Sequence, residues 1–150
     1  MEKKTRKEFI DHGCGFPVIL RNVSMVRIRG IWTPNINYQL MHKIVLTALV
    51  HKPARLTGAE IRFIRHHFEM TTQSFAKRFS VTHPAVLKWE KCGKHSSTMS
   101  WATEKDLRLF VMLHLTRKAR DILVLYQELE EQKTLKTVPV TIDARYALAA

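Results

Sequence analysis

Residues 57–91 read TGAEIRFIRHHFEMTTQSFAKRFSVTHPAVLKWEK and contain three consecutive helix-start signals. Thr57 and Glu60 have the spacing of a capping box, in which a hydroxyl and a carboxylate satisfy unpaired backbone amides of a first helical turn. Thr71 and Thr82 are further N-cap candidates, because a threonine hydroxyl can accept a hydrogen bond from an amide of the following turn. The stretch therefore predicts three short helices in succession.

The third predicted helix begins at His83. Pro84 fits its first turn, where the amide that proline lacks would have no intrahelical partner. Val86 and Trp89 are three residues apart and predict a buried stripe, so we expect Trp89 in the core. The other faces carry small or polar residues in the first turn and Lys88 in the second, as a helix that enters a DNA major groove requires. A solvated helix face is the alternative interpretation.

The pattern of this stretch resembles the XRE/Cro-type helix-turn-helix regulators. The chain departs from that family at Thr72, where the family often has glutamine, and at Ser80, where it usually has glycine. A longer similarity covers roughly residues 56–114 and is closest to the DNA-binding half of MqsA-like antitoxins. The segments that carry the resemblance are LTGAEIRFIR, Phe75-Ala76, Ser80-Val81-Thr82, WEK and ATEKDLRLF.

The resemblance implies a homodimeric repressor that binds double-stranded DNA and acts on its own promoter. It also implies that Arg65 and Glu90 pair between the first and third helices and fix the angle of the third. The third helix would contact base edges, and residues at its borders would hold phosphates. The expected DNA-binding residues are Thr72, Gln73, Thr82, His83, Pro84, Ala85, Lys88, Lys91 and Lys94.

Two other functions stay open from the sequence. One is an antitoxin of a type II toxin–antitoxin pair, which would also neutralise a protein toxin. MqsA-like antitoxins bind the toxin through an N-terminal zinc module with paired cysteines, whereas residues 1–54 contain only Cys14, so we expect no Cys-based zinc site and no cofactor. The other is a basic RNA- or ribosome-associated protein, for which the N-terminal segment offers the aromatic residues Phe16 and Trp32.

The chain has a formal net charge of +12, of which residues 1–54 contribute +6, residues 55–95 contribute +5 and residues 96–150 contribute +1. The positive charge therefore lies in the predicted helices and upstream of them. Basic ribosomal and membrane-surface proteins share this composition, so the charge favours a nucleic-acid partner only in combination with the helical pattern.

Catalysis and metal binding are not expected. Cys14 has no flanking signature of a nucleophile. His66 and His67 are adjacent and point about 100° apart on a helix, whereas a two-histidine metal site needs i, i+4 spacing. Cys14 and Cys92 have no paired spacing and are expected as free thiols. The apolar runs fall short of the roughly 20 residues that span a bilayer, so we expect a cytoplasmic protein with no membrane contact.

We expect a mainly α fold, in which a five-helix XRE/Cro-like helix-turn-helix domain follows a small N-terminal extension of β-ribbon plus helix. Residues 1–54 would supply the basic segment, a ribbon that ends at Pro34 and a helix that stops before Pro53. Residues 55–133 would form the DNA-binding domain, completed by two amphipathic helices. Residues 134–150 would be a C-terminal arm, an added strand or a disordered segment.

Overall fold

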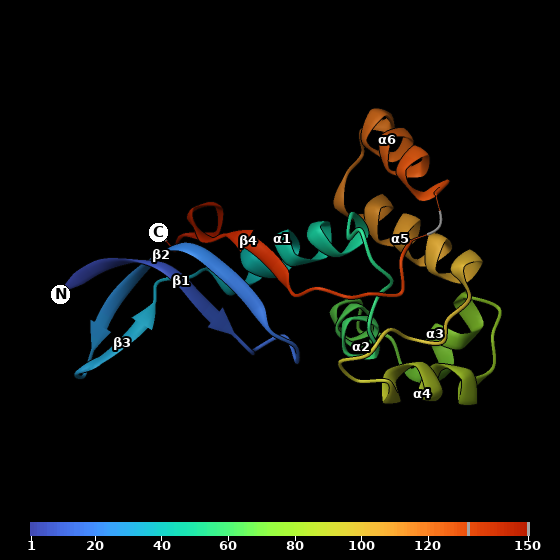
Figure 1. The fold of residues 1–150 in the computed structure, drawn as a ribbon, viewed down its shortest axis with the longest axis horizontal. Helices are drawn as coiled ribbons and strands as arrows, with labels where there is room; N and C mark the ends of the chain where they lie inside the picture. The colour runs from blue at the N-terminus through green and yellow to red at the C-terminus, as the bar shows by residue number, and fades with distance from the viewer. Residues whose placement is uncertain (132, 150) are drawn as a thin grey trace. The chain divides into compact units, whose positions relative to one another are not determined.

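The computed structural model describes residues 1–131 and 133–149 (Figure 1). The chain divides into two compact units. The first consists of Met1–Ala48 together with the C-terminal segment that begins at Pro139, and the second is Leu49–Val138. Each unit has its own core of buried side chains, and each is described by itself below.

The first unit is built on a four-stranded mixed sheet with β2 at its centre. β1 pairs antiparallel with β2 from Lys3 to Arg6 and from Glu8 to Asp11. On the other edge of β2, β3 pairs antiparallel with its last residues, and β4 pairs parallel with its first residues. The strands are β1 Lys3–Asp11, β2 Val18–Ile28, β3 Ile31–Pro34 and β4 Val140–Asp143.

A two-residue turn joins β2 to β3 and confirms the predicted hairpin that ends at Pro34. Arg29 and Gly30 occupy the turn with φ of 50° and 81°. Positive φ at both central positions is the requirement of a type I′ turn, whose twist matches that of the flanking strands.

The buried face of β2 changes phase at Asn22. Val18 and Leu20 are buried before it, and Val23 and Met25 are buried after it. Strict alternation would keep all buried positions even-numbered. Asn22 has φ of 56°, a left-handed conformation that asparagine tolerates better than most residues. This break in the extended backbone brings the odd-numbered Val23 and Met25 into the core after it.

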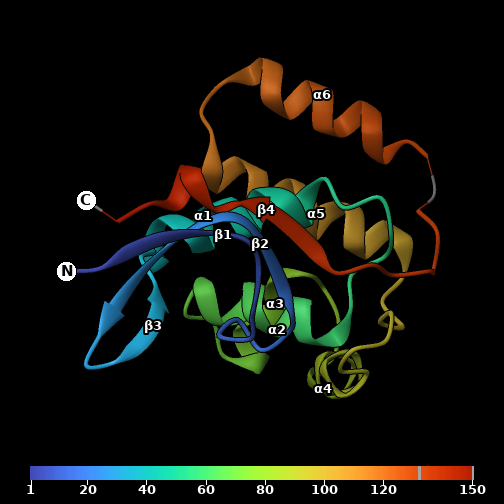
Figure 2. The same cartoon turned by 60° about the vertical axis from the view of Figure 1, so that its left-hand side comes forward.

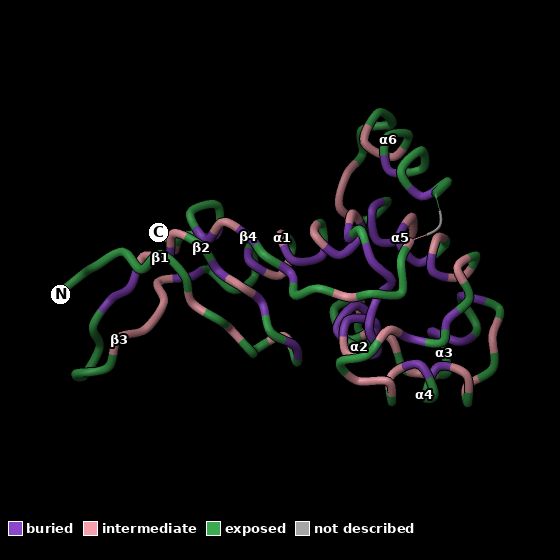
Figure 3. The backbone as a smooth tube through the Cα atoms, viewed as in Figure 1, coloured by how far each residue is buried: buried purple, intermediate pink, exposed green. Residues whose placement is uncertain are grey.

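The helix α1, Tyr38–Val50, follows the hairpin and confirms the helix expected upstream of Pro53. Asn37 accepts a hydrogen bond from the Leu40 amide at its start. A 3-10 turn, Ala144–Ala147, follows β4. Most of the buried residues of the first unit belong to β2, β4, α1 and this turn, and Phe16 and Ile36 add to them from the connecting segments (Figure 3).

The second unit contains five helices: α2 Gly58–His67, α3 Thr72–Arg78, α4 His83–Lys91, α5 Trp101–Leu115 and α6 Ala119–Leu129. The predicted caps are confirmed, since Thr57 and Glu60 form the capping box of α2, and Thr71 and Thr82 cap α3 and α4. Figure 2 shows α6 beside α5, which it contacts.

Five charged side chains lie buried in the core of the second unit. The Lys52 ammonium donates to both carboxylate oxygens of Glu60 at 2.8 and 2.9 Å. Glu104 accepts from Arg55 at 2.9 Å and from Arg108 at 2.7 Å. A buried charge is tolerated only when it is paired and hydrogen-bonded, and each of these groups has a partner of opposite sign.

The expected fold class is wrong. Among the described residues the chain forms six α-helices and a four-stranded mixed sheet, and not a mainly α five-helix XRE/Cro-like domain with a small ribbon and helix attached. Lys3–Asp11 forms an edge strand with almost every side chain exposed, so it lacks the apolar alternation that predicts a strand. Val140–Asp143 becomes a strand only by pairing with β2, more than 110 residues away along the chain.

Candidate nucleic-acid interface on α3 and α4

A short hydrogen-bonded turn around Ser80 and Val81 joins α3 to α4. After α3 the Ser80 amide donates to the Lys77 carbonyl, and the Val81 amide donates to the Ala76 carbonyl at 2.9 Å. These are the two hydrogen bonds of a Schellman motif, which satisfies carbonyls at the end of a helix. Ser80 has φ of 56°, so it adopts the left-handed conformation for which glycine is the usual residue. Serine therefore fills the turn without changing its hydrogen bonds.

The ring of Phe79, at the end of α3, is buried and contacts α5. It meets Phe110 edge-on, with ring centroids 5.6 Å apart. Phe68, at the end of α2, also contacts the Phe110 ring, with ring centroids 5.1 Å apart. Phe110 thus joins the ends of two helices, which holds the start of the turn against the core.

The α4 helix has one buried face and one exposed face. Val86 and Trp89 are buried, as the sequence predicts, and Leu87, Lys88 and Lys91 are exposed. Figure 3 shows this alternation along the helix, which lies at the edge of the second unit. α4 contacts α2 and α3. Its exposed face is therefore available to an external partner.

The predicted DNA-binding residues are distributed unequally over this surface. Thr72, His83 and Ala85 are half-buried. The Nδ1 atom of His83 is buried and has no hydrogen-bond partner among the described residues, so this nitrogen cannot contact DNA in this conformation. The predicted residues with exposed side chains are Gln73, Thr82, Pro84, Lys88, Lys91 and Lys94.

Arg65 and Glu90 lie together, as the resemblance implies. The guanidinium donates to the Glu90 carboxylate from Nε at 3.1 Å and from Nη2 at 2.8 Å. Its Nη1 donates to the Met70 carbonyl at 3.0 Å. The side chains of Arg65 and Glu90 are only 12% and 10% exposed. The pair therefore links α2, the loop that follows it and α4 in a fork geometry that fixes direction as well as distance.

Gly58 makes a second contact between α2 and α4, which the sequence did not predict. A Cβ atom at this position would lie 2.3 Å from the Trp89 carbonyl oxygen, 2.7 Å from the Gly93 nitrogen and 2.9 Å from the Glu90 carbonyl oxygen. All three atoms belong to the backbone, so a rotamer change cannot relieve the contact. The local sequence hints at this close contact only through the position of the glycine, because a capping box does not itself require one.

The loop after α4 also caps α2. The Gly58 amide donates to the His95 carbonyl at 3.3 Å, and the Ala59 amide donates to the Gly93 carbonyl at 2.9 Å. The first amides of a helix have no partner within the helix. The end of α4 and its loop therefore satisfy the start of α2, and the loop that carries Lys94 is held in place by these bonds.

Exposed positive charge adjoins this surface. Lys88 and Lys91 lie on α4, Lys94 lies in the following loop, and none of the three has an ion-pair partner among the described residues. Arg78, at the end of α3, differs, because it is paired with Asp106 at 3.4 Å. The unpaired lysines give α4 the electrostatic character that a phosphate backbone requires.

Within residues 1–131 and 133–149, no three His, Cys, Asp or Glu side chains are grouped closely enough to hold a metal ion. Cys14 and Cys92 are both free thiols, as expected. No helix in the same part of the chain is long and apolar enough to cross a bilayer. Comparison of the chain with protein-family models, with curated proteins and with solved structures found no match.

Proposed function

We propose that the chain is a sequence-specific DNA-binding transcriptional regulator, which acts in the cytoplasm as a homodimeric repressor and reads DNA with α4. One observation supports this function above the others. α4 is a capped helix whose Val86 and Trp89 are buried, while Lys88 and Lys91 are exposed on its other side and have no carboxylate partner among the described residues. A rigid helix with a small first turn and basic flanks is what a major groove admits.

The ties between α2 and α4 add to this support. A recognition helix must keep a fixed orientation in its domain, because hydrogen bonds to base edges form only over a narrow range of distances and angles. The Arg65–Glu90 fork and the backbone approach at Gly58 restrain α4 from the same neighbouring helix. The XRE/Cro-type resemblance carries the same implication, and it is part of the proposal.

The operator can be found by selecting genomic fragments with the purified protein and sequencing those that it retains. We expect a two-fold symmetric site with half-site centres about 34 Å apart, or a multiple of that, because two copies of α4 must meet the major groove on one side of the duplex.

Three lysine variants then distinguish base reading from charge. Lys88→Ala should cost about 1–3 kcal/mol on the selected site and relax the preference at one base pair, most simply a guanine. Lys94→Ala should weaken all duplexes alike and reduce the salt slope by about one phosphate charge. Lys43→Ala, an exposed lysine of α1 in the first unit, is the matched control and should change neither.

Fluorescence anisotropy on matched and mismatched duplexes across a salt series measures both effects. Equal weakening of every duplex by Lys88→Ala would remove α4 as the reading helix. The basic N-terminal segment would then be the better candidate.

A further inference from the structure

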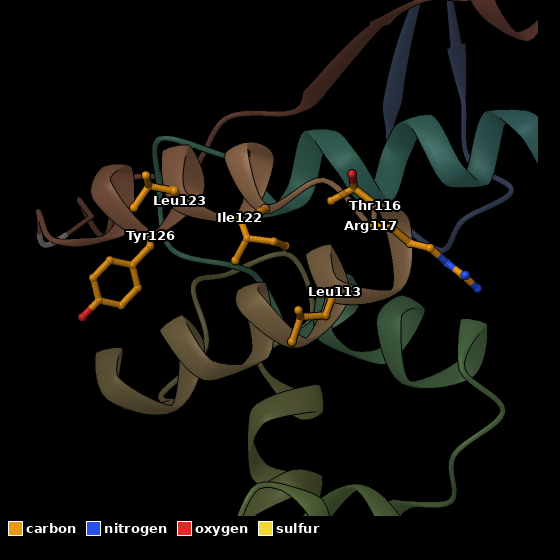
Figure 4. Close-up of a pocket in the computed structure, with 7 residues that line it drawn as sticks. Leu113, Thr116, Arg117, Ile122, Leu123 and Tyr126 are labelled. Carbon is orange, nitrogen blue, oxygen red and sulfur yellow. The ribbon is translucent and has the colours of Figure 1, made fainter.

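An open apolar groove lies between the end of α5 and α6 (Figure 4). Its volume is about 580 Å³. Leu113 of α5 and Ile122 of α6 point into the same space from opposite sides. The lining residues are Leu113, Thr116, Arg117, Ala119, Ile122, Leu123 and Tyr126.

The apolar side chains around this groove are exposed to an unusual degree. Leu125 and Leu129 of α6 are buried and hold this helix against the rest of the second unit. On the groove side, Leu123 is 57% exposed, Tyr126 is 52% exposed and Leu113 is 60% exposed. Exposed apolar side chains that adjoin one another and are rimmed by polar residues are a feature of interaction sites.

The charges on α6 are divided between its two ends. Basic side chains gather at the start of the helix, and acidic side chains gather at its end. Ala119, Leu123, Tyr126 and Glu130 follow one another at i, i+4, i+7 and i+11, so the apolar stripe itself ends on a carboxylate. The basic residues at the start are Arg117, Lys118 and Arg120, which outnumber the one carboxylate there, Asp121, an acceptor of a hydrogen bond from the Thr116 hydroxyl at 2.8 Å. The acidic residues at the end are Glu130 and Glu131, which are exposed, and Glu128, which pairs with His51 at 2.7 Å.

We propose that this groove is the homodimer interface, and that it is occupied by α6 of a second copy of the chain lying antiparallel. A two-fold axis between Leu123 and Tyr126 places Leu123 of one copy against Tyr126 of the other. The same axis brings the basic start of each helix to the acidic end of its partner. The surface is therefore complementary to itself, as a two-fold interface must be.

The charge pattern selects this occupant over others. A parallel second copy would oppose basic ends to basic ends and acidic ends to acidic ends, and like charges in contact weaken an interface. An external peptide of a single sign would be attracted at one end of the groove and repelled at the other. Only a partner with the same two-ended charge pattern in reverse satisfies both ends, and an antiparallel α6 has that pattern.

Sedimentation velocity of the full chain from about 1 to 200 μM, without DNA, tests the interface, since contacts of this limited size give dissociation constants on the order of micromolar. We expect a reversible monomer–dimer equilibrium. Leu123→Glu should raise the dissociation constant at least about tenfold, because it places a carboxylate in the apolar centre. Val124→Glu is the matched control, since Val124 is adjacent, 44% exposed and absent from the groove lining, and the control should leave the constant unchanged.

Charge-reversed variants test the orientation and alter only exposed side chains. Arg117→Glu with Arg120→Glu makes both ends of α6 acidic, and Glu130→Arg with Glu131→Arg makes both ends basic. Each variant alone should be monomeric where the wild type is dimeric, and an equal mixture should form a heterodimer. Added salt should weaken the wild-type dimer. A wild-type dimer that strengthens with salt would indicate the parallel arrangement and overturn the proposal.

The homodimer is part of the proposed function, but dimerisation is measured in the absence of DNA, so failure of the interface is distinguishable from failure of DNA binding. A chain that stays monomeric over the whole concentration range refutes the interface and leaves base reading by α4 open. A dimer that is insensitive to Leu123→Glu also refutes it, since association must then use another surface. A dimer that responds as expected but binds no DNA refutes the proposed function alone.

Discussion

Glu104 and Arg108 lie one turn apart on α5 and form an ion pair 2.7 Å long in which neither side chain is exposed. Arg108 also donates to the carbonyl oxygens of Val50, Lys52 and Ala54 at 3.2, 2.7 and 2.6 Å. Burial lowers the pKa of the Arg108 guanidinium, and the Glu104 carboxylate opposes that shift. The pair therefore fastens α5 to the segment that leads into α2.

Glu104→Gln should destabilise the second unit by about 3–5 kcal/mol. The substitution removes the carboxylate shared by Arg55 and Arg108 and leaves two buried guanidinium groups without a counter-charge. Urea unfolding at pH 7 measures the loss. Asp106→Asn is the control, because its pair with Arg78 is exposed and should contribute no more than about 1 kcal/mol. Equal losses in the two variants would mean that burial does not govern the Glu104 cluster.

The Arg65–Glu90 pair should show strong coupling in a double-mutant cycle. Glu90→Ala leaves the Arg65 guanidinium almost buried without its carboxylate, which should cost on the order of 3 kcal/mol. An exposed pair would contribute at most about 1 kcal/mol. The cycle Arg65→Ala, Glu90→Ala and the double variant, followed by urea unfolding, measures the coupling. A coupling energy of zero would show that the fork does not hold α4 in solution.

Gly58→Ala should cost about 1–3 kcal/mol, although alanine is normally the better helix residue. The new methyl group meets the backbone of Trp89 and Glu90, so α2 and α4 must move apart. Thermal unfolding measures the loss. Gly13→Ala is the control, because its Cβ would meet only the Asp11 side chain at 3.4 Å or beyond. A neutral Gly58→Ala would indicate that the two helices separate at little cost.

Ser80→Gly should stabilise the chain by roughly 0.5–1 kcal/mol. Ser80 has φ of 56°, where glycine avoids the strain of a Cβ atom, and both bonds of the turn use only backbone groups. Lys77→Gly should act in the opposite direction by up to about 1 kcal/mol, because it introduces glycine into the last turn of α3, where the backbone is helical. Chemical denaturation of both variants gives the two signs. Destabilisation by both would show that the serine side chain itself supports the turn.

Cys14 should react slowly with iodoacetamide at pH 8. Burial raises the pKa of its thiol from 9.0 to about 11, and the nearby Asp11 carboxylate adds to the shift. The thiolate fraction then falls about 100-fold, while the more basic thiolate recovers about tenfold in nucleophilicity, for a net slowing of about tenfold.

A Cys92→Ser background isolates this thiol, and mass spectrometry follows alkylation against a short unfolded peptide that contains residues 9–18. The rate at Cys14 should continue to rise between pH 9 and 11, where the peptide thiol levels off. Asp11→Asn should move the profile to lower pH. A profile that levels off near pH 9 would contradict the burial of the thiol.

The sequence by itself determined the local elements of the second unit. The helix caps are local, because the side chains of Thr57, Thr71 and Thr82 each accept a hydrogen bond from a backbone amide three residues later. Such caps can be predicted from a short stretch of sequence. The stripe of Val86 and Trp89 is equally local, because helical periodicity places both residues on one side wherever the helix packs. The same reasoning identified the hairpin turn before Pro34.

Only the tertiary structure decided the rest. Lys3–Asp11 and Val140–Asp143 are strands because β2 supplies their hydrogen-bond partners. Lys3–Asp11 is mostly charged and has little β propensity of its own, and the weak β character of Val140–Asp143 does not indicate that it joins β2, more than 110 residues away along the chain. Gly58 is required by the backbone of another helix, and Glu104 is tolerated in the core because two arginines converge on it. Caps and stripes depend on neighbours along the chain, whereas sheet pairing, close backbone approach and buried charge depend on neighbours in space.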